Sequence, residues 1–164
     1  MDELQIRLFT ADDAPAVSRL IIRNLTEVLV SAYGETAMQA LAAHYRPVDV
    51  VTRARDRYKI VSELHGEIVG TASLAGDRVS DLFVHVDHHA AGIGSELLSA
   101  VEGEAWRRGM NEVYLMAGLP ARGFYENQGY VVVAPELHDV DGYPIEMLRM
   151  TKALPDTIGR DAPA

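Results

Sequence analysis

The order of apolar and polar residues divides the chain into helical and extended segments. Apolar side chains recur every three or four residues from Ala14 to Val28 and again from Ile93 to Ala105, which predicts two amphipathic helices. Thr10 is the expected N-cap of the first helix. The second is expected to span about 92–108, because Arg107–Gly109 has the residues typical of a helix C-terminus.

Extended segments are predicted where apolar and polar residues alternate, or where a short apolar run lies between turn residues such as His65-Gly66. The predicted strands are Gln5–Phe9, Tyr58–Leu64, Glu67–Leu74, Val79–Val86, Val113–Ala117, Tyr130–Val133 and Tyr143–Lys152. Shorter helices are predicted over Glu35–Tyr45, from Pro47 onward and over Ala121–Asn127. This order predicts an α/β fold, a single domain over 1–154 around one mixed sheet, with a loose tail over 155–164.

Composition and charge narrow the classes of function. The chain has 164 residues, no cysteine and a formal net charge of −9. The missing cysteines exclude disulfides, thiolate zinc sites and a cysteine nucleophile. The negative charge argues against nucleic acid as a partner and favours a cationic substrate such as an amine. No apolar run is long enough to span a membrane, and the acidic start does not resemble a signal peptide, so we expect a cytoplasmic protein without membrane contact.

The segment Leu82–Ser95 holds the clearest sign of ligand binding. It leaves a predicted strand, passes through a loop of small residues and enters the long helix. Free N–H groups and the positive end of the helix dipole at such a junction suit a phosphate group, and Gly92 and Gly94 have no side chain to block it. Taken alone, however, a Gly-x-Gly of this kind is more often a tight turn.

Two common nucleotide-binding patterns do not fit this segment. The dinucleotide fingerprint G-x-G-x-x-G requires glycine at 97, where Leu97 stands, and it follows the first strand of its domain. A P-loop requires Gly-Lys-Ser or Gly-Lys-Thr, and the sequence has neither.

A second motif, Ala121–Tyr130, contains Phe-Tyr-Glu followed by Gly-Tyr. With the strand Leu82–His85 and the Gly-x-Gly after it, this motif resembles the GNAT superfamily of acyl-CoA N-acyltransferases. In that family such a strand is followed by R/Q-x-x-G-x-G/A and a long helix, and later by a helix reading like Phe-Tyr-Glu-x-x-Gly-Tyr. The resemblance covers Gln5 to Lys152 in element order and is specific between Tyr58 and Val133.

The resemblance implies a mostly antiparallel sheet flanked by helices. It also implies transfer of an acetyl group from acetyl-CoA to a primary amine of a small molecule, peptide or protein, by direct attack in a ternary complex. No metal is needed. The segment expected to hold the coenzyme A pyrophosphate consists of His89, Ala90, Ala91, Gly92, Ile93, Gly94 and Ser95. The strand residues expected to pair with the pantetheine arm are Leu82, Phe83 and Val84. Tyr125 is expected beside the thioester sulfur as the general acid.

The chain departs from the family pattern at several places. His89 stands where the family has arginine or glutamine, and Ala91 stands where a basic residue is usual, so the loop offers less charge to a phosphate. Many relatives carry a glutamate on the strand after the long helix and an asparagine before the last helix, where Met116 and Gly118 stand here. The resemblance therefore leaves the identity of the base open.

The residues themselves offer candidates for both proton transfers. A period of two places Asp81, Phe83 and His85 on one face of their strand, opposite Leu82 and Val84, which are expected to face the long helix. Asp81 is the candidate that accepts the amine proton through water, and a surface acid at a strand end is the alternative. Tyr125, with an ordinary phenol pKa of about 10, suits a departing thiolate; core packing is its alternative role.

Other interpretations stay open. His85, His88 and His89 suggest a metal site, but consecutive histidines at a strand exit rarely converge on one ion. A non-catalytic acyl-CoA sensor would keep the glycine loop without needing Tyr125, and a plain interaction module would need neither motif. The acceptor region is expected in Leu25–Asp56 and in a loop over Glu136–Tyr143. A homodimer is expected from the resemblance alone.

Overall fold

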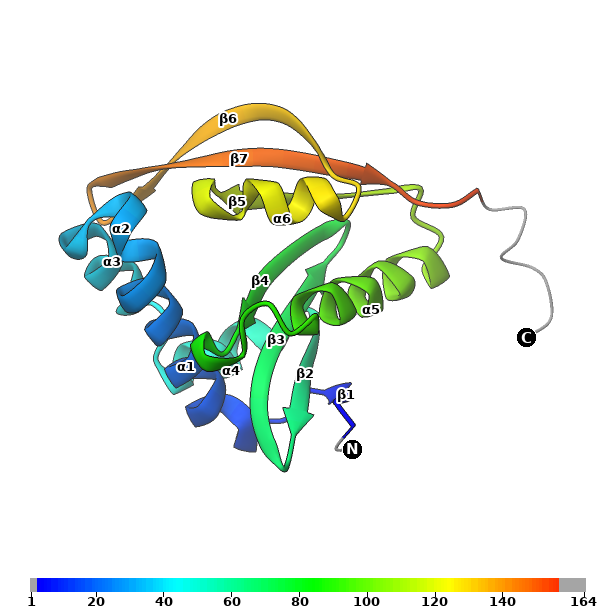
Figure 1. Ribbon diagram of the computed structural model, residues 1–164, viewed down its shortest axis with the longest axis horizontal. Coiled ribbons are helices and arrows are strands. Elements are labelled where there is room, and N and C mark those ends of the chain that lie inside the picture. The colour runs from blue at the N-terminus through cyan, green and yellow to red at the C-terminus, as the bar shows by residue number, and fades with distance from the viewer. Residues whose placement is uncertain (1–2, 157–164) are drawn as a thin grey trace.

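A seven-stranded sheet in the order β1-β2-β3-β4-β5-β7-β6 runs through residues 3–156, which are the residues that the computed structural model describes (Figure 1). Neighbouring strands are antiparallel, except that β4 and β5 are parallel. The strands are β1 (Gln5–Leu8), β2 (Tyr58–Leu64), β3 (Glu67–Ala75), β4 (Arg78–Val84), β5 (Glu112–Gly118), β6 (Val131–Val140) and β7 (Tyr143–Ala153). The predicted mixed, mostly antiparallel α/β fold is confirmed.

Helices precede and interrupt the strands as the apolar periodicity predicts. They are η1 (Ala11–Asp13), α1 (Ala14–Arg23), η2 (Asn24–Leu29), α2 (Val30–Tyr33), α3 (Glu35–Ala42), α4 (Pro47–Ala54), η3 (Val86–His88), α5 (Ile93–Arg107), η4 (Leu119–Ala121) and α6 (Arg122–Asn127). The segment η2 is π-helical, so it widens the helical run between α1 and α2.

The sheet separates two apolar cores. Helix α5 packs against β2, β3 and β4 on one face, whereas α1 and α4 lie on the other (Figure 1). Gly70 on β3 lets α5 approach closely, because a Cβ there would lie 2.6 Å from Leu97 Cδ1. As predicted, Leu82 and Val84 pack on the α5 side and Phe83 on the other.

Strands β4 and β5 meet at one register pair and then separate. That pair is Arg78 with Tyr114, and the Tyr114 N–H donates to the Asp77 carbonyl at 3.0 Å. On the opposite edge, the His85 N–H donates to the Val69 carbonyl of β3 at 2.8 Å. Since backbone groups alternate in direction along a strand, Val84 directs its own N–H and C=O away from β3. The end of β4 therefore has an open edge on the β5 side.

Strand β6 is longer than the sequence indicates. The predicted loop over 136–143 is wrong, because β6 continues through Val140 and pairs with β7 up to Tyr143. Pro135 and the polar residues Glu136, His138 and Asp139 give this part of the strand the composition of a loop. Because β6 is the outermost strand, a proline without an N–H donor is tolerated there.

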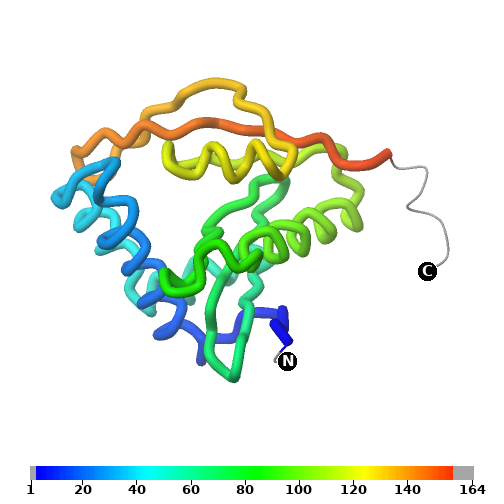
Figure 2. The backbone as a smooth tube through the Cα atoms, in the orientation of Figure 1, coloured from blue at the N-terminus to red at the C-terminus, as the bar shows by residue number. Residues whose placement is uncertain are grey.

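The far end of the β6–β7 hairpin returns to the helices (Figure 2). The Tyr33 hydroxyl donates to the Glu146 carbonyl at 2.7 Å and accepts from the Leu119 N–H at 2.9 Å. His44 Nε2 lies 2.8 Å from Asp141 Oδ2 at the hairpin turn. These contacts connect the two halves of the sheet across the place where β4 and β5 part. Of the predicted loose tail, 157–164 lie outside the described residues.

Candidate functional site

The open edge of β4 is held by two side chains. Asn24, at the start of η2, is buried and donates from Nδ2 to the Val84 carbonyl at 2.8 Å and to the Leu20 carbonyl at 2.9 Å. His89 Nε2 lies 2.9 Å from the same Val84 oxygen and 3.1 Å from Asn24 Oδ1. Both partners of that nitrogen are acceptors, so the ring binds them only with a proton on Nε2. The Val84 carbonyl therefore accepts hydrogen bonds from two side chains, Asn24 and His89, at this edge.

The loop before α5 turns sharply next to this edge. Ala90 has φ of 65° and Gly92 has φ of 82°, so both adopt the left-handed conformation. For an alanine this conformation costs about 1 kcal/mol. A Cβ on Gly92 would meet nothing within 4 Å, so the space beside this turn is open. Backbone of this kind next to a helix N-terminus points N–H groups toward one place and suits an anion.

Helix α6 lies against the start of α5. A Cβ on Gly94 would lie 3.2 Å from the Phe124 ring, and the Gln128 side chain donates to Ser95 Oγ at 2.9 Å. A side chain at position 94 would therefore require the Phe124 ring to shift by a few tenths of an ångström. These contacts place α6 and its tyrosine beside the predicted phosphate loop.

Tyr125 is buried between two aromatic neighbours. Its side chain packs edge-on against Phe124 and Tyr130, with ring centroids 5.1 and 5.7 Å away. Burial raises the pKa of the Tyr125 phenol above its usual range. Among the described residues the hydroxyl has no hydrogen-bond partner, although it belongs to a helix that touches the loop. A phenol in such surroundings keeps its proton, as a general acid must.

Asp81 lies at a bulge of β4 and faces the helices opposite α5. The pairing with β3 shifts between Thr71 and Ser73, and Asp81 has φ of 51°. Its carboxylate accepts from the Tyr45 hydroxyl at 3.0 Å and lies 3.6 Å from Arg57 Nη1. Only 12% of its side chain is exposed. These contacts hold Asp81 in a structural cluster, and its role as a base stays a prediction.

The histidines of the loop do not converge. His85 Nδ1 accepts from the Asp87 N–H at 3.1 Å and its ring packs edge-on against His88, while His89 turns to Val84. The described part of the chain contains no group of three or more histidine or acidic side chains that could hold a metal ion. Within that part, no helix is both long and apolar enough to cross a membrane.

The structure brings most of the predicted site residues together. Val84, His89, the turn Ala90–Gly92 and the start of α5 with Gly94 and Ser95 surround one end of β4. Ile93 instead packs into the core on the α5 side, as does Leu82. Asp81 lies apart, in its cluster with Arg57 and Tyr45.

Asn24 is the residue that sequence reasoning missed. It lies three residues after Ile21 and four before Val28, on the predicted buried face of the first helix. A polar side chain in that position needs a buried hydrogen-bond partner. That requirement is the signal that could have identified it.

One comparison with known proteins identifies the family of this chain. The family model described as the acetyltransferase (GNAT) domain matches residues 29–154. A search of curated proteins returned no significant match.

Among solved structures, the chain is similar to a GCN5-related N-acetyltransferase from Rhodopseudomonas palustris. The TM-score is 0.89 at 26% identity, over 94% of this chain and 98% of that one. It is also similar to the PaiA N-acetyltransferase from Thermoplasma acidophilum in complex with coenzyme A, with a TM-score of 0.75 at 16% identity over 93% and 99% of the two chains. A third structure is a putative acetyltransferase, YncA, from Salmonella typhimurium with acetyl-CoA. There the TM-score is 0.65 at 20% identity, over 98% and 99%.

Proposed function

Because the chain belongs to the GNAT acetyltransferase family, we propose that it transfers an acetyl group from acetyl-CoA to a primary amine by direct attack in a ternary complex. The observation that supports this most is the open edge of β4 beside the N-terminus of α5. An extended amide chain can pair with such an edge, and its phosphates can reach the helix terminus. Similar structures solved with coenzyme A or acetyl-CoA also support it.

The residues at the edge fit the two parts of this cosubstrate. The Val84 carbonyl accepts a hydrogen bond from a pantetheine N–H. His89, rather than Asn24, leaves this carbonyl when the cosubstrate binds, because His89 is exposed whereas Asn24 is buried. A displaced His89 then faces the phosphate end of the loop. The N–H groups of Ala90–Ser95 hold the pyrophosphate, and Gly92 leaves room for it.

The proposed reaction consists of one substitution at the thioester carbonyl carbon and two proton transfers. The amine nitrogen forms a bond to the thioester carbonyl carbon, and the carbon–sulfur bond breaks. Tyr125 donates the proton that the sulfur takes up, because burial keeps the phenol protonated. The amine proton leaves through water. Asp81 remains the candidate acceptor from the sequence, although its contacts with Tyr45 and Arg57 better support a structural role.

The acceptor is proposed only by class. The net charge of −9 favours a cationic amine. Similar folds include an aminoglycoside 6'-N-acetyltransferase, whose name describes transfer to an amine. A homodimer and a cytoplasmic location remain predictions. The alternative is an acyl-CoA sensor of the same fold, which would bind acetyl-CoA without turning it over.

Thermal unfolding with acetyl-CoA tests the cosubstrate. We expect acetyl-CoA to raise the melting temperature and NADH to leave it unchanged, because a ligand that binds only the folded state stabilises it. Ala91, exposed in the loop, gives a matched pair of variants. Ala91→Arg should tighten binding and Ala91→Glu should weaken it, each by about tenfold, since the added charge lies near the phosphates. Equal affinities in both variants would place the phosphates elsewhere.

A further inference from the structure

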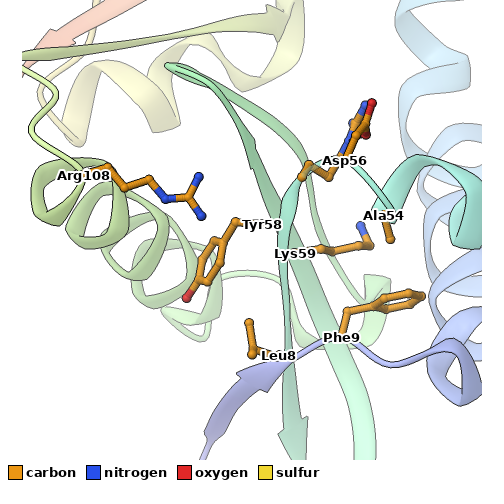
Figure 3. Close-up of a pocket in the computed structure, with 8 residues that line it drawn as sticks. Leu8, Phe9, Ala54, Asp56, Tyr58, Lys59 and Arg108 are labelled. Atoms are coloured by element: carbon orange, nitrogen blue, oxygen red, sulfur yellow. The ribbon is translucent and has the colours of Figure 1, made fainter.

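A cavity lies away from the open edge of β4, where β1 ends and β2 begins (Figure 3). Its volume is ≈ 440 Å³, within the range of small-molecule sites. The residues that line it are Leu8, Phe9, Ala54, Asp56, Arg57, Tyr58, Lys59 and Arg108. Arg108 follows the last residue of α5, whereas the predicted phosphate loop precedes the first. Fifteen helical residues, about 22 Å in length, separate the two ends.

Lys59 is the most unusual residue of this cavity. It is 6% exposed, yet the only hydrogen bond of its amino group within the described residues goes to Ser73 Oγ, at 3.2 Å. An ammonium group has three donors, so two lack a partner among residues 3–156. No carboxylate of the described residues forms an ion pair with it. Burial lowers the pKa of Lys59 to about 8, although the charge of Asp81 opposes that shift.

Two more cations border the same cavity. Arg57 Nη1 lies 3.6 Å from Asp81, and Arg57 Nε is buried without a hydrogen bond, although Asp56 Oδ1 lies 3.5 Å away. The Arg108 guanidinium lies over the Tyr58 ring, 5.6 Å from its centroid. Arg108 is paired with Glu104 at 3.1 Å, and Arg57 lies next to Asp56 and Asp81. Lys59 is therefore the cation of this cavity that has no carboxylate partner among the described residues, and an anionic ligand would supply one.

The apolar lining of the cavity also indicates which chemical group the anionic ligand has besides its charge. Phe9 places its ring 5.7 Å from the Lys59 amino group, and Figure 3 shows both on the same side of β2. Leu8, Tyr58 and Arg108 line the cavity from the other side of that strand. A bare inorganic ion would leave the Phe9 ring uncovered, whereas a small aromatic or aliphatic group would contact it.

We propose that this cavity binds a small organic carboxylate, with Lys59 and Arg57 holding the carboxylate and Phe9 contacting its apolar body. Such an anion supplies the counter-charge that the buried amino group lacks and the acceptors that the unused donors need. Arg57 is shared with Asp81, so the ligand also competes for the ion-pair partner of that β4 residue. The site is separate from the proposed acetyl-CoA site and does not depend on it.

Calorimetric titration of the full chain with benzoate tests the proposal, with benzamide and inorganic phosphate as comparison ligands. We expect benzoate to bind, and both other ligands to bind at least about tenfold more weakly, because one lacks the charge and the other the apolar body. Lys59→Met keeps a similar length without the charge and should weaken benzoate binding by about tenfold or more. Arg55→Gln is the matched control, since it removes an exposed charge outside the cavity.

Backbone NMR in the same titration locates the ligand. Shifts at Phe9, Lys59 and Ser73 support the proposal, whereas shifts centred on Gly92–Ser95 would show that benzoate occupies the acetyl-CoA loop. The proposal is also overturned if benzamide or phosphate binds as well as benzoate, or if folded Lys59→Met, checked by circular dichroism, retains the parental affinity. None of these outcomes depends on acetyl transfer, so the carboxylate site and the proposed acetyltransferase function are tested independently of each other.

Discussion

The most specific chemical roles proposed for the site belong to single side chains, and that of Tyr125 is the most specific of them. Its position in a Phe-Tyr-Glu motif made it a candidate from the sequence, but the sequence does not reveal its surroundings. The structure adds that the ring is buried between Phe124 and Tyr130 and that the hydroxyl has no partner among the described residues. The hydroxyl oxygen is not one of the fully buried side-chain atoms that lack a hydrogen bond, so it is accessible to a reacting group.

Tyr125→Phe should lower turnover at least about a hundredfold, because a positioned general acid contributes that factor or more. Acetyl-CoA affinity and thermal stability should stay close to the parent. Burial raises the pKa of Tyr125, so the acid stays protonated below about pH 10 and the rate should not fall there through its ionisation. Initial rates against pH measure both effects.

Tyr130→Phe is the matched control, since it removes a neighbouring buried hydroxyl that donates to Glu102 at 2.8 Å. It should cost about 1 kcal/mol of stability and leave turnover nearly parental. Equal turnover in the two tyrosine variants would reduce Tyr125 to a packing residue.

Asp81→Asn separates the two roles of that residue. If Asp81 fixes the bulge of β4, the loss of its ion pair with Arg57 should lower stability and change turnover little. If it accepts the amine proton, turnover should fall, and the rise of the rate with pH should shift, at nearly parental stability. Urea unfolding and a pH–rate profile on the same preparation distinguish the outcomes.

At the scale of elements, α5 is the part that positions the site, and its distance from the sheet depends on Gly70. Gly70→Ala should destabilise the fold by about 1–3 kcal/mol, because the new Cβ meets Leu97 and Ser62 at 2.6 and 2.7 Å. Gly123→Ala on α6, where a Cβ meets nothing within 4 Å, should be neutral or stabilising. Similar urea midpoints for both variants would contradict the close packing of α5.

Most elements could be predicted because local periodicity determines them. The helix from Ala14 and the hairpin of β2 and β3 follow from apolar spacing and turn residues alone. The second half of β6 could not be predicted in this way. An edge strand tolerates Pro135 and polar neighbours, so its pattern resembles a loop. The π-helical turn at Asn24 has no periodic signal, and only the polar residue on a buried face indicates it.

At the scale of the molecule, the separation of β4 and β5 is what creates the site. It depends on contacts between residues far apart in the chain, which no local pattern contains. Tyr33 reaches Leu119 and Glu146, which are 86 and 113 positions away, and His44 reaches Asp141. The family resemblance implied the strand pairing with pantetheine, but the clamp of Asn24 and His89 on Val84 required the structure.

Amine-dependent release of free thiol from acetyl-CoA tests the central claim most directly. The parent protein should be screened against polyamines, aminoglycosides and peptide N-termini, with mass spectrometry of each amine. We predict that at least one amine gains one acetyl group for each thiol released, and that Tyr125→Phe suppresses both. If acetyl-CoA stabilises the protein but no amine in the screen is acetylated, transfer is contradicted and the chain is an acyl-CoA sensor.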